Sequence, residues 1–164
     1  MTKIVSNSSP IIGLSMIGLL HLLWKMFHPY IPKAVYDEIV NNQSEHCYGK
    51  EELKIAVEKG NIKIYEVKDK SLVDKLYGTL HKGEIETVIA AKEMGLTYVL
   101  IDEKAARNFA TSFFLKPIGI LGLLQRAKEL GYIEKLKPYL DTLRRNGFRI
   151  SDKLYYLLLK RVNE

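Results

Sequence analysis

The sequence predicts an α/β fold in which a central parallel β-sheet is covered by helices on both faces. Short apolar runs, such as residues 97–101, alternate along the chain with segments whose apolar residues recur at helical spacing. This alternation is typical of parallel sheets with two buried faces. The chain has 164 residues, of which 47% are hydrophobic and 27% charged, so it suits one globular domain. The same composition excludes a disordered chain, a collagen-like repeat and a coiled-coil rod.

The first half of the chain begins with a short strand and a long apolar segment. Ile4-Val5 is the predicted strand, and a polar turn at residues 6–9 ends it. Pro10 suits the first turn of the next helix, with Ser9 as its cap. The apolar segment 10–24 fits a buried helix beside the sheet. Further along we expect a strand at 30–31, helices at 32–40 and 51–59, and an alternating strand at 62–67 with one face exposed to solvent.

The second half continues the same alternation of strands and helices. Its clearest buried strand is residues 97–101, and Asp102 stands directly at its C-terminal end. Residues 116–118 are predicted to form a short edge strand. Helices are expected at 71–80, 83–94, 103–113 and 120–130, and two more surround the turn at 146–148.

The positive charge of the chain is concentrated near its C-terminus. The 25 basic and 19 acidic residues give a net charge of +6. Residues 1–114 contain 14 of each sign, whereas residues 115–164 contain 11 basic and 5 acidic residues, so 11 minus 5 accounts for the whole excess. A basic C-terminal third indicates either a polyanionic partner such as RNA or a solvated, lysine-rich surface. The candidate nucleic-acid-binding residues in it are Arg126, Lys128, Arg144, Arg145 and Arg149.

Cysteine content and hydropathy indicate a cytoplasmic protein with no membrane partner. One cysteine excludes a disulfide framework and a cysteine zinc cluster. The apolar segment 10–24 is shorter than the roughly 20 residues that a membrane span needs. Only Lys3 is charged before this segment and no A-x-A site follows it, so we do not expect a signal peptide.

Polar side chains gather where the predicted strands end. Asn7 follows the first strand and Asp102 follows the strand at 97–101. In a parallel sheet, ligands bind at the C-terminal ends of the strands. Glu38 and Glu84, on predicted helices, can reach the same edge if these helices pack beside those strands. Three carboxylates and an amide suit magnesium or manganese, and the chemistry that they support best is phosphoryl transfer.

Each of these residues also fits a purely structural role. Asp102 suits the cap of the next helix, and Glu38 is one of several acids on its helix. Glu84 is a first-turn acid that complements the helix dipole. Asn7 and Ser9 are common turn formers.

Other polar residues carry weaker signals. Glu86 lies about 200° around its helix from Glu84, so we expect it on the surface. Arg107, after Asp102, suits either a phosphate contact or a surface ion pair. His46 and Cys47 fit a solvated pair in a polar linker rather than a metal site. The sequence contains no phosphate-binding Walker loop, dinucleotide glycine pattern or serine-nucleophile elbow.

Four segments carry a resemblance to a known family. They are residues 4–12 (IVSNSSPII), 31–39 (IPKAVYDEI), 82–91 (KGEIETVIAA) and 99–107 (VLIDEKAAR). In this order and spacing they resemble the PIN-domain family over nearly the whole chain. The tail, with 119–124 (GILGLL) and 147–151 (GFRIS), is similar to one PIN-like branch.

The resemblance implies a fold, an activity and partners. The fold would be a three-layer α/β/α PIN-like domain at residues 1–130, with a basic helical C-terminal extension at 131–164 packed on the same domain. Most members are metal-dependent ribonucleases that use magnesium or manganese, and many are VapC-like toxins. The implied partners are RNA, an antitoxin protein and a second copy of the chain in a homodimer.

The resemblance also assigns site residues. Asn7, Glu38, Glu84 and Asp102 occupy the four metal-ligand positions in chain order, and Ser9 matches a small polar residue that supports the first. Glu84 stands where aspartate is usual, and Asn7 replaces a carboxylate with a neutral amide. Two hypotheses follow. In the first, the protein is a metal-dependent endoribonuclease with Glu38, Glu84 and Asp102 as its catalytic residues. In the second, it is an RNA-binding or regulatory protein that kept the fold and lost the chemistry.

Overall fold

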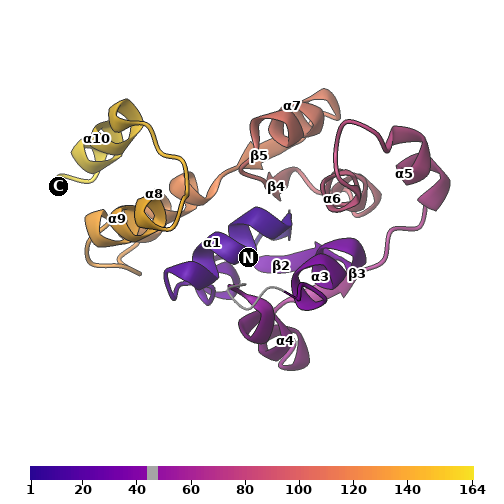
Figure 1. The fold of residues 1–164 in the computed structure, drawn as a ribbon, viewed down its shortest axis with the longest axis horizontal. Helices are drawn as coiled ribbons and strands as arrows, with labels where there is room; N and C mark the ends of the chain where they lie inside the picture. The colour runs from indigo at the N-terminus through magenta and orange to yellow at the C-terminus, as the bar shows by residue number, and fades with distance from the viewer. Residues whose placement is uncertain (44–47) are drawn as a thin grey trace.

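The protein is built around a five-stranded sheet in which every pair of neighbouring strands is parallel. The computed structural model describes residues 1–43 and 48–164, so His46 and Cys47 lie outside the described residues. The strand order is β3-β2-β1-β4-β5 (Figure 1). The strands are β1 (Lys3–Ser6), β2 (His28–Pro32), β3 (Lys63–Tyr65), β4 (Tyr98–Leu100) and β5 (Lys116–Ile118).

Helices connect the strands and follow the last of them. The first half holds α1 (Ser8–Met16), α2 (Leu22–Met26), α3 (Lys33–Val40) and α4 (Lys50–Glu58). The second half holds α5 (Lys70–Leu76), α6 (Lys82–Glu93), α7 (Lys104–Ser112), α8 (Ile120–Glu129), α9 (Lys137–Arg145) and α10 (Asp152–Arg161).

Side chains alternate between the two faces of the sheet and give each face its own core. Ile4 and Leu100 lie on the face covered by α1–α4 and α8–α10. Val5 and Val99 lie on the opposite face, under α5–α7. Because helices cover both faces, the three-layer α/β/α architecture predicted from the sequence is confirmed.

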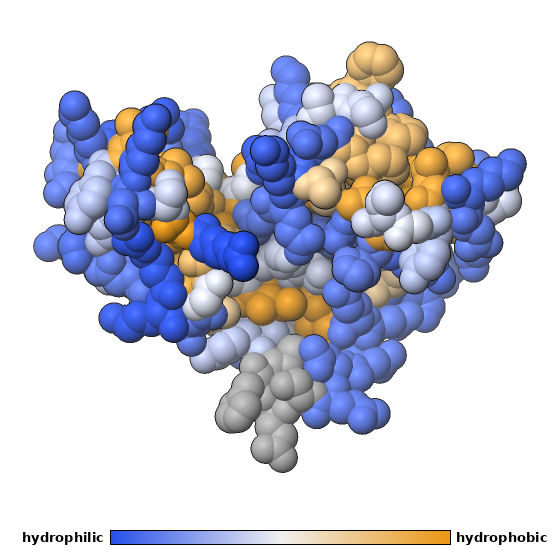
Figure 2. Space-filling model, turned by 45° about the horizontal axis from the view of Figure 1, so that its top comes forward, coloured by the Kyte–Doolittle hydropathy of each residue, from blue (hydrophilic) through white to orange (hydrophobic). Residues whose placement is uncertain are grey.

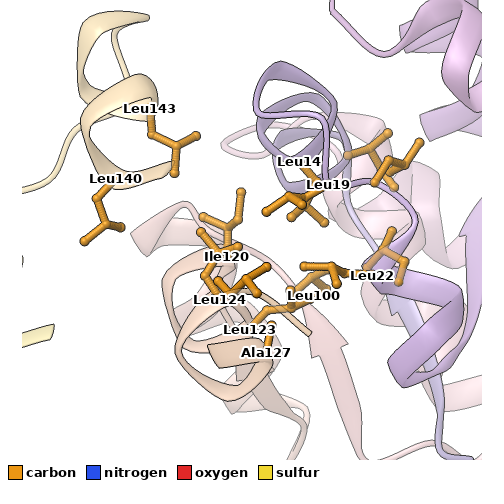
Figure 3. Close-up of a cluster of buried hydrophobic side chains, with 14 of the residues drawn as sticks. Leu14, Leu19, Leu22, Leu100, Ile120, Leu123, Leu124, Ala127, Leu140 and Leu143 are labelled. Atoms are coloured by element: carbon orange, nitrogen blue, oxygen red, sulfur yellow. The ribbon is translucent and has the colours of Figure 1, made fainter. Parts of the chain in front are cut away.

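The core of the first face extends into the C-terminal helices. Figure 3 shows apolar side chains of α1, α8 and α9 gathered beside β4. Leu14, Ile120, Leu124, Leu140 and Leu143 are all fully buried in this cluster. Residues on both sides of position 130 therefore share one core, and the domain boundary placed there stays a prediction.

Helices α1 and α8 approach closely at Gly13. A Cβ at this position would lie 2.8 Å from Ile120 Cδ1 and 3.3 Å from Phe148 Cε2. A side chain at position 13 would therefore require the side chains of Ile120 and Phe148 to move.

Three predicted elements differ from the structure, and one of them is the helix expected at 71–80, which ends at Leu76. The segment 10–24 is not one helix, because α1 ends at Met16 and α2 begins at Leu22. Gly18 has a φ of +71°, a left-handed conformation that turns the chain between them. The strand predicted at 62–67 is limited to Lys63–Tyr65, at the edge of the sheet, where it pairs only with β2 among the described strands.

The surface has two raised parts. Figure 2 shows the C-terminal helices as one part, largely hydrophilic on its outer side, with a hollow between it and the part that carries α5, α6 and α7. Within residues 1–43 and 48–164, no helix has the length and apolar character needed to cross a membrane.

Candidate metal centre

Asn7 lies at the end of β1 with an unsatisfied acceptor. Its backbone N–H donates to the Leu100 carbonyl at 3.0 Å, which holds it against the end of β4. It precedes α1 in an extended conformation (φ −78°, ψ 176°). The residue is 1% exposed, and its Oδ1 accepts a hydrogen bond from none of the described residues. A buried acceptor of this kind is costly unless a ligand, ion or water satisfies it.

The side-chain oxygens of Glu38 and Asn7 both lie close to Gly83. A Cβ on Gly83 would lie 3.0 Å from Glu38 Oε2 and 3.8 Å from Asn7 Oδ1. The absence of a side chain therefore lets the start of α6 approach both oxygens. The other Glu38 oxygen, Oε1, accepts a hydrogen bond from Ser8 Oγ at 3.4 Å.

Glu84 and Glu103 form a carboxyl pair beside this position. Burial is the main cause that raises the pKa of Glu84, which is 5% exposed, to about 7. The hydrogen bond and the negative charge of Glu103 raise it further, as does the charge of Glu38, while His81 opposes the shift. Carboxyl groups this close favour a shared proton near neutral pH.

Glu103 was not among the residues predicted from the sequence. It also accepts a hydrogen bond from Ser9 Oγ at 2.8 Å, so Ser9 links α1 to this pair and does not cap its own helix. The predicted helix cap at Ser9 is wrong because α1 already begins at Ser8. The rule that selected Asp102, a polar residue directly after a buried strand, could have selected Glu103 as well.

Asp102 is held by the first amide of α8. Its Oδ1 accepts a hydrogen bond from Ile120 N at 2.7 Å, whereas its buried Oδ2 has no donor within the described chain. Burial raises the pKa of Asp102 to about 6, although the Ile120 amide and the Arg107 charge oppose this. Asp102 therefore contacts the helix after β5, and Glu103 rather than Asp102 occupies the cap position of α7.

Arg107 positions the end of β4. Its Nη1 donates to the Ile101 carbonyl at 2.9 Å and its Nη2 to the Pro117 carbonyl at 3.4 Å. A Cβ on Gly119 would lie 3.1 Å from both Arg107 Nη1 and Asp102 Oδ1, so the two charges are near each other. The guanidinium thus spans the ends of β4 and β5 beside Asp102.

Glu86 is buried, which corrects the surface position expected from helical spacing. It is 8% exposed and forms an ion pair with Lys82 Nζ at 3.9 Å. Helical spacing places Glu86 on the face away from Glu84, but α6 is buried on nearly all sides between α3, α5 and α7. The predicted direction of the Glu86 side chain is therefore correct, whereas its predicted exposure to solvent is wrong.

The basic residues near the C-terminus differ in how freely they could bind a phosphate. Arg126 pairs with Glu129 at 3.2 Å, and Lys128 pairs with Glu164 at 3.7 Å. Arg144 pairs with Asp152 and lies 4.7 Å from the centre of the Tyr155 ring. Arg145 and Arg149 are exposed, and the Arg145 guanidinium donates to Thr142 Oγ1 at 3.0 Å. Their proposed contact with nucleic acid stays a prediction.

The donor chemistry of the site fits a hard divalent cation. In the part of the chain that the structure describes, no three acidic, histidine or cysteine side chains stand as a ready-made metal-binding group. The side chains nevertheless offer oxygen donors only, the type that magnesium and manganese prefer. Two of these oxygens, Asn7 Oδ1 and Asp102 Oδ2, are buried and have no hydrogen-bond partner among the described residues. They follow the neighbouring strands β1 and β4.

A comparison with protein families agrees with this fold. A PIN-domain family model, DUF3368, matches residues 3–164, which is nearly the whole chain. The chain therefore belongs to the PIN-domain family, whose fold is of the nuclease type. A search of curated proteins found no match to it.

Proposed function

We propose that the protein is a metal-dependent endoribonuclease that hydrolyses phosphodiester bonds of RNA. The observation that carries the proposal is the pair of buried, unsatisfied oxygens, Asn7 Oδ1 and Asp102 Oδ2, at the ends of the adjacent strands β1 and β4. Together with Glu38 and Glu84 they are the residues that would hold magnesium or manganese. When bound, such an ion polarises the phosphate and lowers the pKa of an attacking water.

The protein side chains have separate tasks in this proposal. Glu38 and Asn7 bind the ion above Gly83. Asp102 is kept in place by Ile120 N and by the neighbouring Arg107. Glu84 would bind the ion in its ionised form, so metal binding should release the proton that the Glu84–Glu103 pair holds near neutral pH.

Asn7 limits the charge of the site. Glu38, Glu84 and Asp102 supply three negative charges when ionised, whereas a fourth carboxylate would balance two divalent ions. We expect one ion to bind well and a second weakly, so cleavage is slow in magnesium and faster in manganese. RNA as substrate, an antitoxin as inhibitor and a homodimer as assembly are parts of the same proposal.

The test compares the wild type with Asn7→Asp and Glu38→Gln. Calorimetric titration with manganese and a cleavage time course on single-stranded RNA should show tighter binding and faster cleavage for Asn7→Asp. Glu38→Gln should lose both. Asn61→Asp, which adds the same charge before β3 at the opposite edge of the sheet, is the control and should behave as the wild type.

A second readout does not depend on activity. Manganese at a hundred times its dissociation constant should stabilise the folded wild type by roughly 2.7 kcal/mol in thermal unfolding. Asp102→Asn keeps an acceptor for Ile120 N and should reduce this stabilisation. If the wild type neither binds manganese nor cleaves RNA, and Asn7→Asp restores neither, the proposal fails and the non-catalytic RNA-binding hypothesis takes its place.

A further inference from the structure

A cavity of about 360 Å³ lies next to the candidate metal centre. It is lined by α3, α5, α6 and the segment after β3. Its volume is within the range of small-molecule sites, roughly 300–1,000 Å³. The neighbouring depression, lined by Glu38, His81 and Gly83, shares Ala34, Asp37 and Lys82 with it. One continuous surface therefore leads from the carboxylates of the metal centre into the cavity.

The cavity combines an apolar wall with one buried carboxylate. Val67 and Val73 are buried side chains that contribute apolar surface. Glu86 lies in the lining, and its ion pair with Lys82 Nζ, at 3.9 Å, is longer than a hydrogen bond. Its oxygens can thus accept hydrogen bonds from a ligand that enters the cavity.

Charged side chains of both signs surround this carboxylate, because three lysines and the acids Asp37, Glu66 and Asp74 also line the cavity. Lys82 reaches the cavity from α6 and Lys33 from α3, and their side chains are 62% and 54% exposed. Lys70 reaches it from α5. The three ammonium groups offset these three acids, so they can contact the phosphates on either side of a base that is inserted into the cavity.

We propose that this cavity, the guanine cavity, binds the guanine base beside the scissile phosphate of the RNA, and that Glu86 selects it. The inference rests on the proposed nuclease function. Glu86 follows Gly83 by three residues on α6, which is about 4.5 Å along the helix axis. A base in the cavity would therefore belong to a nucleotide next to the bond that is cleaved.

The chemistry of a carboxylate distinguishes guanine from the other bases. Guanine presents two adjacent donors, N1–H and N2–H, which match the two oxygens of one carboxylate. Adenine and cytosine place an unprotonated ring nitrogen beside their amino group, and uracil places carbonyls on both sides of N3–H. Each of these acceptors would face a carboxylate oxygen and be repelled. Single-stranded RNA exposes these base edges, so they are available for recognition.

The first experiment measures cleavage of short RNAs in manganese. Each contains one guanosine, or inosine in its place, because inosine lacks only the N2 amino group. We expect cleavage next to guanosine to be about 5- to 150-fold faster in the wild type, the range for one good bidentate contact. Glu86→Gln should bring the ratio close to one. Glu58→Gln, an exposed acid on α4, should keep it.

The second experiment separates this inference from the proposed function. Binding of guanosine and inosine monophosphate is measured by calorimetry on the wild type and Glu86→Gln without metal. If no RNA is cleaved but guanosine monophosphate binds more tightly and Glu86→Gln removes the difference, the nuclease proposal fails and guanine recognition by Glu86 stands. If RNA is cleaved without preference for guanosine, the inference is wrong, and tight binding of the free nucleotide would then assign the cavity to a nucleotide ligand.

Discussion

The close approach of α6 to the metal centre at Gly83 gives the sharpest test of the site geometry. In Gly83→Ala, the new Cβ would lie 3.0 Å from Glu38 Oε2 and 3.2 Å from Val35 Cγ2. Both distances require the neighbours to move by a few tenths of an ångström. Val35 is fully buried and cannot move freely, so Glu38 must yield.

The expected magnitudes follow from these contacts. Replacing glycine by alanine in a helix normally stabilises a protein by about 0.5–1 kcal/mol, but the crowding at Gly83 should offset this gain. Metal–ligand distances tolerate deviations of only about 0.2 Å. A shift of Glu38 beyond this tolerance should weaken manganese binding by roughly 10- to 100-fold, the loss that is typical when the groups that support a metal ligand are changed.

The assay pairs manganese calorimetry with urea unfolding, and Gly122→Ala is the matched control. Gly122 also lies in the first turn of a helix, α8, but a Cβ there would meet only Ile118 Cγ2 at 3.9 Å. Gly122→Ala should gain about 0.5–1 kcal/mol of stability and bind manganese as the wild type does. Manganese affinity within about threefold of the wild type in Gly83→Ala, well below the expected loss, would refute a cation shared by Glu38 and Asn7.

Two further predictions concern pH and salt. The folded-state pKa is raised for Glu84, from 4.5 to about 7, and for Asp102, from 3.8 to about 6. The metal-free folded state therefore holds protons that the unfolded state loses, so stability should fall between about pH 4 and 7 and then level off. Urea unfolding of Glu84→Gln should show a shallower decline, and a parallel pH profile would contradict the assignment. For salt, Arg145→Ala with Arg149→Ala should make the log–log salt dependence of RNA binding less steep by about 1.4, at 0.7 per phosphate contact. An unchanged slope in fluorescence anisotropy would mean that these exposed arginines do not line the RNA path.

Local patterns were sufficient to predict the layers of the fold. The apolar run 97–101 placed β4 correctly, because a strand buried on both faces needs apolar residues at consecutive positions. The turn at 146–148 separates α9 from α10 as predicted. The break between α1 and α2 was missed, because apolar content continues through Gly18 and only the positive φ reveals the turn.

The candidate site was less accessible to sequence reasoning because contacts between distant elements build it. Asn7 and Asp102 could be placed at one edge of the sheet because each follows a strand of the predicted parallel sheet. The hydrogen bond of Ser9 with Glu103 and that of Asp102 with Ile120 join residues 94 and 18 positions apart. Helical spacing gave the direction of Glu86 correctly, but its burial depends on the packing of α3 and α5 around α6.

Gly13 lets α1 pack closely against Ile120, the first residue of α8. Asn7 directly precedes α1, Ile120 begins α8, and Ile120 N holds the carboxylate of Asp102. A Cβ added at Gly13 would lie 2.8 Å from Ile120 Cδ1, so a larger residue there would press on the residue whose amide holds Asp102. The spacing of Asn7 and Asp102 thus depends on a glycine that contributes no atom to the chemistry of the site.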